Sequence, residues 1–258
     1  IAGLSPSEKY DIYAGDYNYT LTRNELRRTS RYAASWEGLC HGWAPASLHF
    51  LEPQTTTVTN PDGIVISFGS SDIKALLTLL QGNYNKGKSY MAGTRCESKF
   101  RIRFFRRLDD SCLDVNAGSF HVIMANLIGI LKQGFIFDRD PGAQVWNQPA
   151  QSFVSNIIRS QGPSHNSAPG TVREVVVNTT ITYPREIDPN FFPQNKTTRE
   201  SFRVDKELTY TLELNANGNI IGGKWLSSDY PDFVWTQDKA EFRGLFAPLE
   251  ELYNISIQ

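Results

Sequence analysis

Hydrophobic and polar positions in the first third of the chain follow helical spacing. Ser5-Pro6-Ser7-Glu8 has the form of a capping box with proline at the first helical position, so a helix is expected to begin there. Ser70-Ser71-Asp72 likewise predicts the start of a helix from Ile73 to Leu80, whose apolar residues recur three and four positions apart. Two more helices are predicted between these, one from Thr22 to Arg31 and one that begins at or just before Cys40.

The pattern changes to that of strands after Tyr90. Residues 172–183 are rich in valine and threonine, and the apolar runs 208–214 and 220–226 flank Asn215-Ala216-Asn217-Gly218, a strong hairpin signal. Further strands are predicted over 100–105, 120–128 and 135–137, and a helical tail over 242–253. Because helices precede strands instead of alternating with them, we expect an α+β fold with an antiparallel sheet. No repeat or linker is visible, so residues 1–258 are expected to form a single domain.

Charge and hydropathy exclude two classes of partner. The chain has 26 Lys and Arg against 27 Asp and Glu, and a formal net charge of −1 gives no basic field to attract nucleic acid or an anionic membrane. No apolar run approaches the ~20 residues that a membrane-spanning helix needs. We therefore expect neither a nucleic-acid nor a membrane partner.

The three cysteines point to an exported protein. Cys96 and Cys112 flank a predicted strand, and a disulfide between them would stabilise the fold by ~3 kcal/mol and leave Cys40 as a thiol. Sequons that permit secretion begin at Asn18, Asn178, Asn195 and Asn254.

Phosphate and metal motifs are weak. Gly82–Ser89 matches the letters of a phosphate-binding loop but follows a predicted helix, whereas that loop needs a strand before it and a helix after it. We expect a helix end that runs into a turn. The four histidines have no metal-ligand spacing, Asp114-x-Asn116-x-Gly118 lacks the glutamate that closes a calcium loop, and Asp138-x-Asp140 is similarly partial. No metal site is therefore assigned and no cofactor is needed for the chemistry, while a bound calcium ion stays an open alternative.

Cys40, His121 and Asp138 form the strongest candidate for catalysis. A helix N-terminus lowers the pKa of a thiol, a histidine moves the proton, and a third group orients the histidine. If residues 120–128 and 135–138 pair as a hairpin around Gly129-Ile130, His121 and Asp138 stand directly opposite each other. The alternative is a buried thiol, a core histidine and a turn aspartate.

Three segments resemble a known family. Trp36-Glu37-Gly38-Leu39-Cys40-His41-Gly42-Trp43 is similar to the cysteine block of the secreted transglutaminase elicitors of oomycetes and their bacterial relatives. Val145-Trp146-Asn147-Gln148-Pro149 is identical to the opening of the elicitor peptide of that family. Cys112 to His121 resembles a further block, with Ala117, Ser119 and Phe120 in place of the family's proline, threonine and tryptophan.

The resemblance implies acyl transfer from a glutamine to a lysine amine on protein substrates. It also implies a fold similar to papain-like cysteine proteases, secretion or attachment to the cell wall, and a link between calcium and activity. Cys40, His121 and Asp138 would form the triad. Apart from the resemblance, we expect the backbone N–H of Cys40 and the indole N–H of Trp36 to donate to the oxyanion. Trp36 and Trp43 would wall an amine channel, although core packing is the alternative role.

Two rival functions stay open. A cysteine protease or glutamine deamidase has the same geometry, because water and an amine compete for one thioester. Alternatively, the chain is a surface protein without catalytic activity, which a host receptor recognises through residues 145–153.

Overall fold

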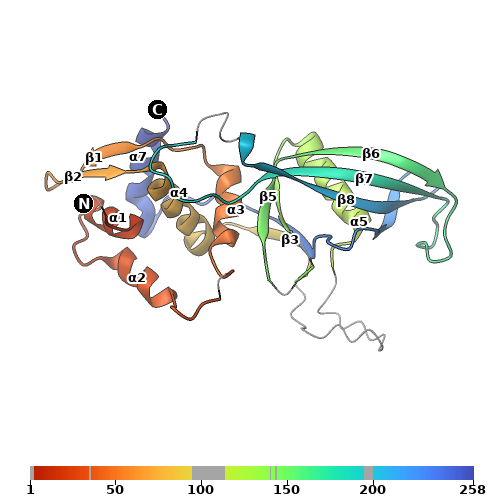
Figure 1. The fold of residues 1–258 in the computed structure, drawn as a ribbon, viewed down its shortest axis with the longest axis horizontal. Coiled ribbons are helices and arrows are strands. Elements are labelled where there is room, and N and C mark those ends of the chain that lie inside the picture. Colours follow the sequence, from red (N-terminus) through yellow and green to blue (C-terminus); the bar gives the residue numbers. More distant parts are fainter. Residues whose placement is uncertain (1–2, 35, 95–113, 140, 143, 195–199) are drawn as a thin grey trace. The chain divides into compact units, whose positions relative to one another are not determined.

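The described residues divide into two compact units, shown in Figure 1. The structure is a computed structural model and describes residues 3–34, 36–94, 114–139, 141–142, 144–194 and 200–258. Unit 1 comprises Ile1–Gly87, Glu186–Ser201 and Asp238–Gln258, and unit 2 comprises Lys88–Arg185 and Phe202–Gln237. Helices occur with antiparallel sheets, which confirms the α+β class; that all 258 residues form one domain stays a prediction.

Unit 1 is mainly helical. Its helices are α1 (Pro6–Tyr13), α2 (Thr20–Arg28), α3 (Cys40–His49), α4 (Ser70–Leu79), the π-helix η1 (Leu80–Tyr84), the 3₁₀-helix η3 (Gly244–Phe246) and α7 (Ala247–Ser256). The unit also contains a hairpin of β1 (Thr56–Thr59) and β2 (Val65–Phe68).

The helix starts show which caps the sequence reveals. The capping box of α1 is confirmed, because the Ser5 side chain accepts the N–H of Glu8 and the Glu8 carboxylate accepts the N–H of Ser5. Helix α2 begins two residues before the predicted Thr22 and ends at Arg28, not Arg31. Its cap comes from α1, since the Asp11 carboxylate accepts the backbone N–H groups of Leu21 and Thr22 at 3.0 and 2.9 Å.

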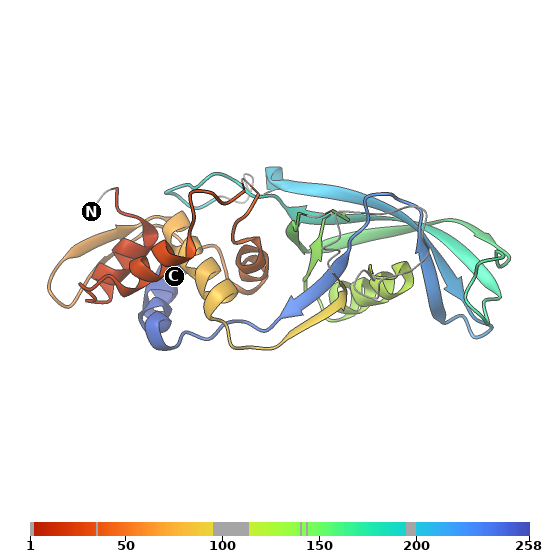
Figure 2. The ribbon, with the colours of Figure 1, turned by 90° about the horizontal axis from the view of Figure 1, so that it is seen from below.

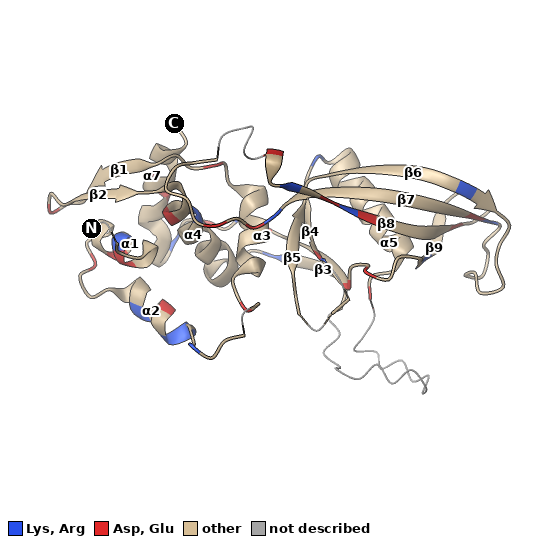
Figure 3. Cartoon of the chain, in the orientation of Figure 1, with Lys and Arg blue, Asp and Glu red and all other residues tan. Residues whose placement is uncertain are grey.

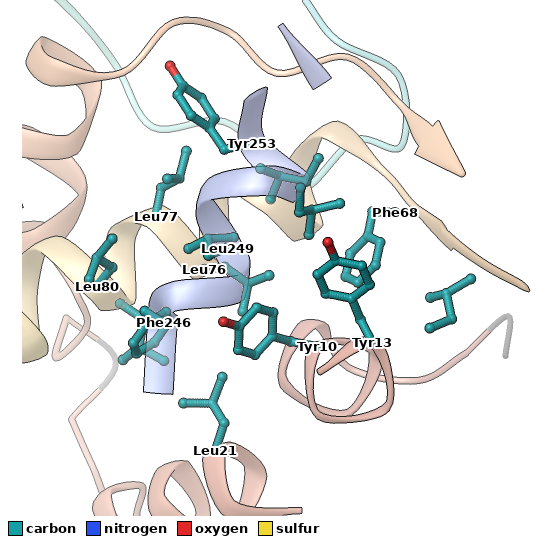
Figure 4. Packing of buried hydrophobic residues seen from close by; sticks show 14 of the residues in the cluster. Tyr10, Tyr13, Leu21, Phe68, Leu76, Leu77, Leu80, Phe246, Leu249 and Tyr253 are labelled. Atoms are coloured by element: carbon teal, nitrogen blue, oxygen red, sulfur yellow. The ribbon is translucent and has the colours of Figure 1, made fainter. Parts of the chain in front are cut away.

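The core of unit 1 lies between its helices and the β1–β2 hairpin. Figure 4 shows Tyr10, Leu76 and Leu249 pointing toward one another from α1, α4 and α7, and all three are buried. The ring of Tyr10 stacks on Phe246 with centroids 5.7 Å apart. Burial of this apolar surface is the main stabilising contribution to the unit.

Helix α3 packs against η1 through glycines. A Cβ on Gly42 would stand 2.3 Å from the carbonyl oxygen of Thr78 and 3.0 Å from the Cα of Gly82. No side chain fits there, so the two backbones touch. Gly82 opens the stretch that matches a phosphate-loop pattern. The first residues of this stretch form the end of η1, which confirms the predicted helix end, and the chain then leads toward β3. The glycine serves helix packing.

Within its described residues, unit 2 holds two antiparallel sheets and one α-helix with a π-helical end. One sheet has the order β3 (Ser89–Gly93), β10 (Phe233–Gln237), β4 (Phe135–Asp138), β5 (Asn147–Ala150). The other has the order β6 (Ser152–Gln161), β7 (Arg173–Pro184), β8 (Arg203–Leu214), β9 (Ile220–Trp225). The helix is α5 (Ala117–Met124), continued by η2 (Ala125–Ile130).

The predicted hairpin between β8 and β9 is confirmed. Asn215 N–H donates to the carbonyl of Asn219 at 3.0 Å, and Gly218 takes the left-handed φ of 78° that the turn needs. Tyr210 and Trp225 stand opposite each other in this pair. The strands predicted from 172–183 and 135–137 correspond to β7 and β4.

The strand predicted over residues 120–128 is wrong. These residues form α5 and η2, and Figure 2 shows α5 along one face of the β6–β9 sheet. An apolar run of this length fits a buried strand or a buried helix equally well. The helix forms because Asn116 caps it and because Phe120 packs on the rings of Tyr210 and Trp225. The hairpin around Gly129-Ile130 therefore does not exist.

Charged residues occur in both units, and β8 carries basic and acidic residues side by side (Figure 3). Among the described residues, no helix has both the length and the apolar character needed to cross a bilayer.

Glu174, on β7, is a buried carboxylate that accepts several hydrogen bonds. Its carboxylate accepts the hydroxyls of Ser164 and Ser167 and the side-chain amide of Gln161. The serine hydroxyls, first that of Ser164, lower the pKa of Glu174 to about 2.

Glu174 should make the stability of the fold depend on pH in acid. Its pKa lies below the ordinary 4.5, so its contribution is complete above pH 4.5 and is lost as the pH falls toward 2. Urea unfolding of the Glu174→Gln variant between pH 2 and 6 should show a weaker dependence on pH, by up to one proton. The matched control is Glu207→Gln, an exposed carboxylate on β8. Equal pH slopes for all three proteins would contradict this assignment.

The two glycines of the cysteine block should differ in their tolerance of a methyl group. Gly42→Ala forces backbone atoms apart and is expected to destabilise the protein by about 1–3 kcal/mol in urea unfolding. Gly38→Ala is the control, because a Cβ there meets no atom within 4 Å and its φ is not left-handed. A Gly42→Ala variant as stable as Gly38→Ala would show that α3 does not depend on this contact.

Candidate active site

Cys40 is the first residue of α3, as the sequence predicted. Leu39 precedes it as the N-cap residue without a side-chain cap, and the N–H groups of Gly42 and Trp43 both donate to the carbonyl of Leu39 at 2.8 Å. Cys40 is half-buried and lies in unit 1. The first N–H groups of a helix have no acceptor within the helix, so they can donate hydrogen bonds to a group that binds at this end.

The aromatic residues beside Cys40 are half-buried. Trp36 lies in the turn before α3 and Trp43 in its first turn. Their assignment to an oxyanion donor and an amine channel stays a prediction. His41 follows Cys40, and its partial burial, together with the nearby Arg28, lowers the pKa of its imidazole.

His121 lies in the middle of α5, in unit 2. The helix begins at Asn116, whose side chain accepts the N–H of Gly118 at 2.8 Å and donates to the carbonyl of Gly223 at 2.9 Å. These bonds fix the start of α5 on β9. Because His121 is helical, the predicted opposition of His121 and Asp138 across a hairpin is wrong.

The imidazole of His121 forms a hydrogen bond with a tyrosine. His121 Nδ1 lies 2.7 Å from the hydroxyl of Tyr210 on β8. The two rings meet edge to face with centroids 5.8 Å apart. Burial lowers the pKa of His121, so the neutral imidazole is favoured more than in water.

Asp138 ends β4 and is fully buried in unit 2. In the sheet it stands opposite Asn147, not opposite His121. Its Oδ1 accepts the backbone N–H of Trp146 at 2.7 Å, and the N–H of Arg139 donates to the carbonyl of Trp146 at 3.1 Å. Asp138 is therefore bound to the segment that resembles the elicitor peptide.

That segment, Val145–Pro149, leads into β5 and is largely inside the unit. Asn147 and Gln148 are 4% and 3% exposed, whereas Trp146 is half-buried under the guanidinium of Arg139 at 5.3 Å. The indole N–H of Trp235 on β10 donates to the Asn147 side chain at 2.8 Å. In the folded chain Asn147, Gln148 and Pro149 belong to the paired strand β5, and Val145 and Trp146 are half-buried just before it.

Metal ligands do not gather within the part of the chain that the structure describes. No group of three or more His, Cys, Asp or Glu side chains is placed there to hold an ion. In the partial calcium pattern, Asp114 accepts the hydroxyl of Tyr230 and Asn116 caps α5. These residues do not fit a calcium site. Asp140, Cys96 and Cys112 lie outside the described residues, and the disulfide stays a prediction.

The structure joins the predicted site residues to unpredicted partners. Asp138 contacts Trp146, and His121 contacts Tyr210, while Cys40 lies in the other unit. The strand pattern of 208–214 marks Tyr210 as a sheet residue. It carries no sign that the hydroxyl meets His121, because α5 itself was predicted as a strand.

Three comparisons with known proteins bear on these residues. The model of the family described as transglutaminase elicitor matches residues 16–242. No curated protein matches the chain. The crystal structure of the GP42 transglutaminase from Phytophthora sojae is similar, with a TM-score of 0.71 and 21% identity over 99% of this chain and 83% of that chain. At this identity the likeness concerns the fold. Since the family model spans most of the sequence, the protein belongs to the transglutaminase elicitor family.

Proposed function

We propose that the protein is a protein-glutamine γ-glutamyltransferase that joins glutamine and lysine side chains of protein substrates. The observation that carries the proposal is a half-buried cysteine, Cys40, as the first residue of α3 in a chain of this family. A cysteine nucleophile needs a histidine to take and return its proton, and the half-buried His121 is the candidate for this role.

The reaction proceeds in two transfers. The Cys40 thiolate attacks the γ-carboxamide carbon of glutamine, and protonated His121 gives its proton to the departing ammonia. The resulting thioester is attacked by the lysine ε-amine, whose proton His121 accepts as the thiolate leaves. The products are an isopeptide bond and ammonia, and the enzyme returns to its starting state.

The negative oxygen of each tetrahedral intermediate needs hydrogen-bond donors. The backbone N–H of Cys40 is one, because it belongs to the first turn of α3. The indole N–H of Trp36 is proposed as the second. Trp36 and Trp43 would also keep water from the thioester, so that an amine reacts in its place.

The two reacting side chains come from different units, Cys40 from unit 1 and His121 from unit 2. A papain-like architecture, which the resemblance implies, is part of the proposal. The sequence predicts Asp138 as the third member of the triad, and in the fold the Oδ1 of Asp138 accepts the N–H of Trp146. We also propose that the protein is secreted or wall-associated, as the resemblance and the sequons suggest. No group of three or more His, Cys, Asp or Glu side chains among the described residues is placed to hold an ion, so calcium dependence is left to experiment.

A receptor-binding role for residues 145–153 is the second candidate. Asn147 and Gln148 are buried in β5, so recognition would require this segment to leave the sheet, for example as a proteolytic peptide. A synthetic peptide of residues 145–153 would then elicit a host response that the folded Cys40→Ala protein does not.

Incorporation of a fluorescent primary amine into casein tests the enzymatic proposal. The wild-type protein should label casein, and Cys40→Ala should lose the activity by about 10⁴-fold or more, because no thioester forms. Arms with calcium and with a chelator decide whether the ion is needed. Release of ammonia without labelling would instead show a glutamine hydrolase, and equal labelling by Cys40→Ala would exclude Cys40 as the nucleophile.

Alkylation of Cys40 by iodoacetamide tests the pairing with His121 without a substrate. If His121 stabilises the thiolate, the wild-type thiol should react at pH 6 about tenfold or more faster than that of His121→Gln. Mass spectrometry of the Cys40 peptide separates this signal from the other cysteines. His165→Gln is the control, because His165 lies on an exposed loop. Equal rates in His121→Gln and wild type would refute the pairing.

A further inference from the structure

Tyr210 holds His121 by one particular ring nitrogen. The 2.7 Å contact joins the tyrosine hydroxyl to Nδ1, which leaves Nε2 as the other nitrogen of the ring. A neutral imidazole carries its proton on one nitrogen only, so the partner of Nδ1 decides what Nε2 can do.

The position of Tyr210 is itself tightly determined. It is fully buried on β8, opposite Val177 of β7 and Trp225 of β9. Its ring meets those of Phe120 and Trp225 edge to face, at centroid distances of 6.2 and 5.3 Å. Phe120 also precedes His121 on α5. The packing that fixes the helix on the sheet thus fixes the hydroxyl beneath the imidazole.

The hydroxyl of Tyr210 continues into a chain of hydroxyls. Thr179 Oγ1 lies 2.7 Å from it, and Ser155 Oγ lies 2.7 Å from Thr179. Ser155 and Thr179 stand opposite each other in β6 and β7, and Ser155 is half-buried while Thr179 is fully buried. Each hydroxyl donates one hydrogen bond. If Tyr210 donates to Thr179 and Thr179 to Ser155, the oxygen of Tyr210 is left to accept the Nδ1–H of His121.

We propose that Tyr210 is the positioning residue of His121. Its hydroxyl oxygen accepts a hydrogen bond from Nδ1–H, and so keeps Nε2 as the nitrogen that exchanges protons with the Cys40 sulfur and the substrates. This inference rests on the proposed function for the role of Nε2. The burial of Tyr210 raises its pKa to about 12, so the hydroxyl remains protonated and able to donate to Thr179 near neutral pH.

The assignment changes the role of Asp138. With Nδ1 bound to Tyr210, a hydrogen bond donated by His121 to the Asp138 carboxylate would have to use Nε2, the nitrogen that the Cys40 thiol needs. Asp138 instead accepts the N–H of Trp146 and holds the end of β4 to the segment before β5. The group that orients the histidine is then a neutral hydroxyl in place of a carboxylate.

Tyr210→Phe tests the proposal, because it keeps the ring and removes the hydroxyl. We expect kcat for amine incorporation to fall about 10- to 100-fold with little change in KM, since a buried Nδ1–H loses its acceptor. Nitrogen-15 NMR of the His121 ring should show the Nδ1–H tautomer in the wild type and a shift toward the Nε2–H tautomer in the variant. Thr179→Val should change both readouts in the same direction by less, and it guards against a Tyr210→Phe variant that fails to fold.

Tyr230→Phe is the matched control. It also removes a tyrosine hydroxyl in unit 2, one that donates to Asp114 at 2.9 Å, and its ring stacks on Trp225. Wild-type kcat and tautomer are expected there. A Tyr210→Phe variant with the wild-type tautomer and kcat would overturn the proposal. If the wild-type protein incorporates no amine, the proposed function fails, while the tautomer still reports whether Tyr210 positions His121.

Discussion

The hydrogen bond between His121 and Tyr210 depends on how α5 lies on its sheet, and the candidate chemistry depends on that bond. An imidazole in a partly buried place needs partners for its nitrogens, because an unsatisfied polar group is costly there. Tyr210 meets this need from β8, while Phe120, one residue before His121, packs on the same tyrosine ring. Packing and polar contact therefore select the same placement of the helix, and neither can change without the other.

The position of Cys40 depends on a close contact between backbones. Gly42 lets α3 approach the backbone at Thr78 and Gly82, so the helix that begins at Cys40 rests directly on the end of α4 and on η1. The phosphate-loop letters at Gly82–Ser89 are a by-product of this packing and of the turn that follows. A short motif has meaning only in its structural setting: the same letters between a strand and a helix would predict a nucleotide site.

The Val145–Pro149 segment has two roles to consider, recognition by a receptor and pairing within a sheet. The sequence predicts a segment that a receptor recognises, yet here Asn147 and Gln148 are buried and the N–H of Trp146 donates to Asp138. Side chains that pair within a sheet are constrained by stability first. Asn147 of this segment instead accepts a hydrogen bond from Trp235, which ties β5 to β10 within the sheet.

Local chemistry was sufficient for the sequence to determine the α1 capping box, the start of α3 at Cys40, the β8–β9 hairpin and the mixed class of the fold. Each depends on residues close together in the chain. The structure decided what depends on distant residues. Residues 120–128 became helix because Asn116 and the rings of β8 and β9 favour it, and α2 began early because Asp11 of another helix caps it. The same holds for His121, whose partner Tyr210 is 89 residues away: only the folded sheet brings that hydroxyl to the imidazole.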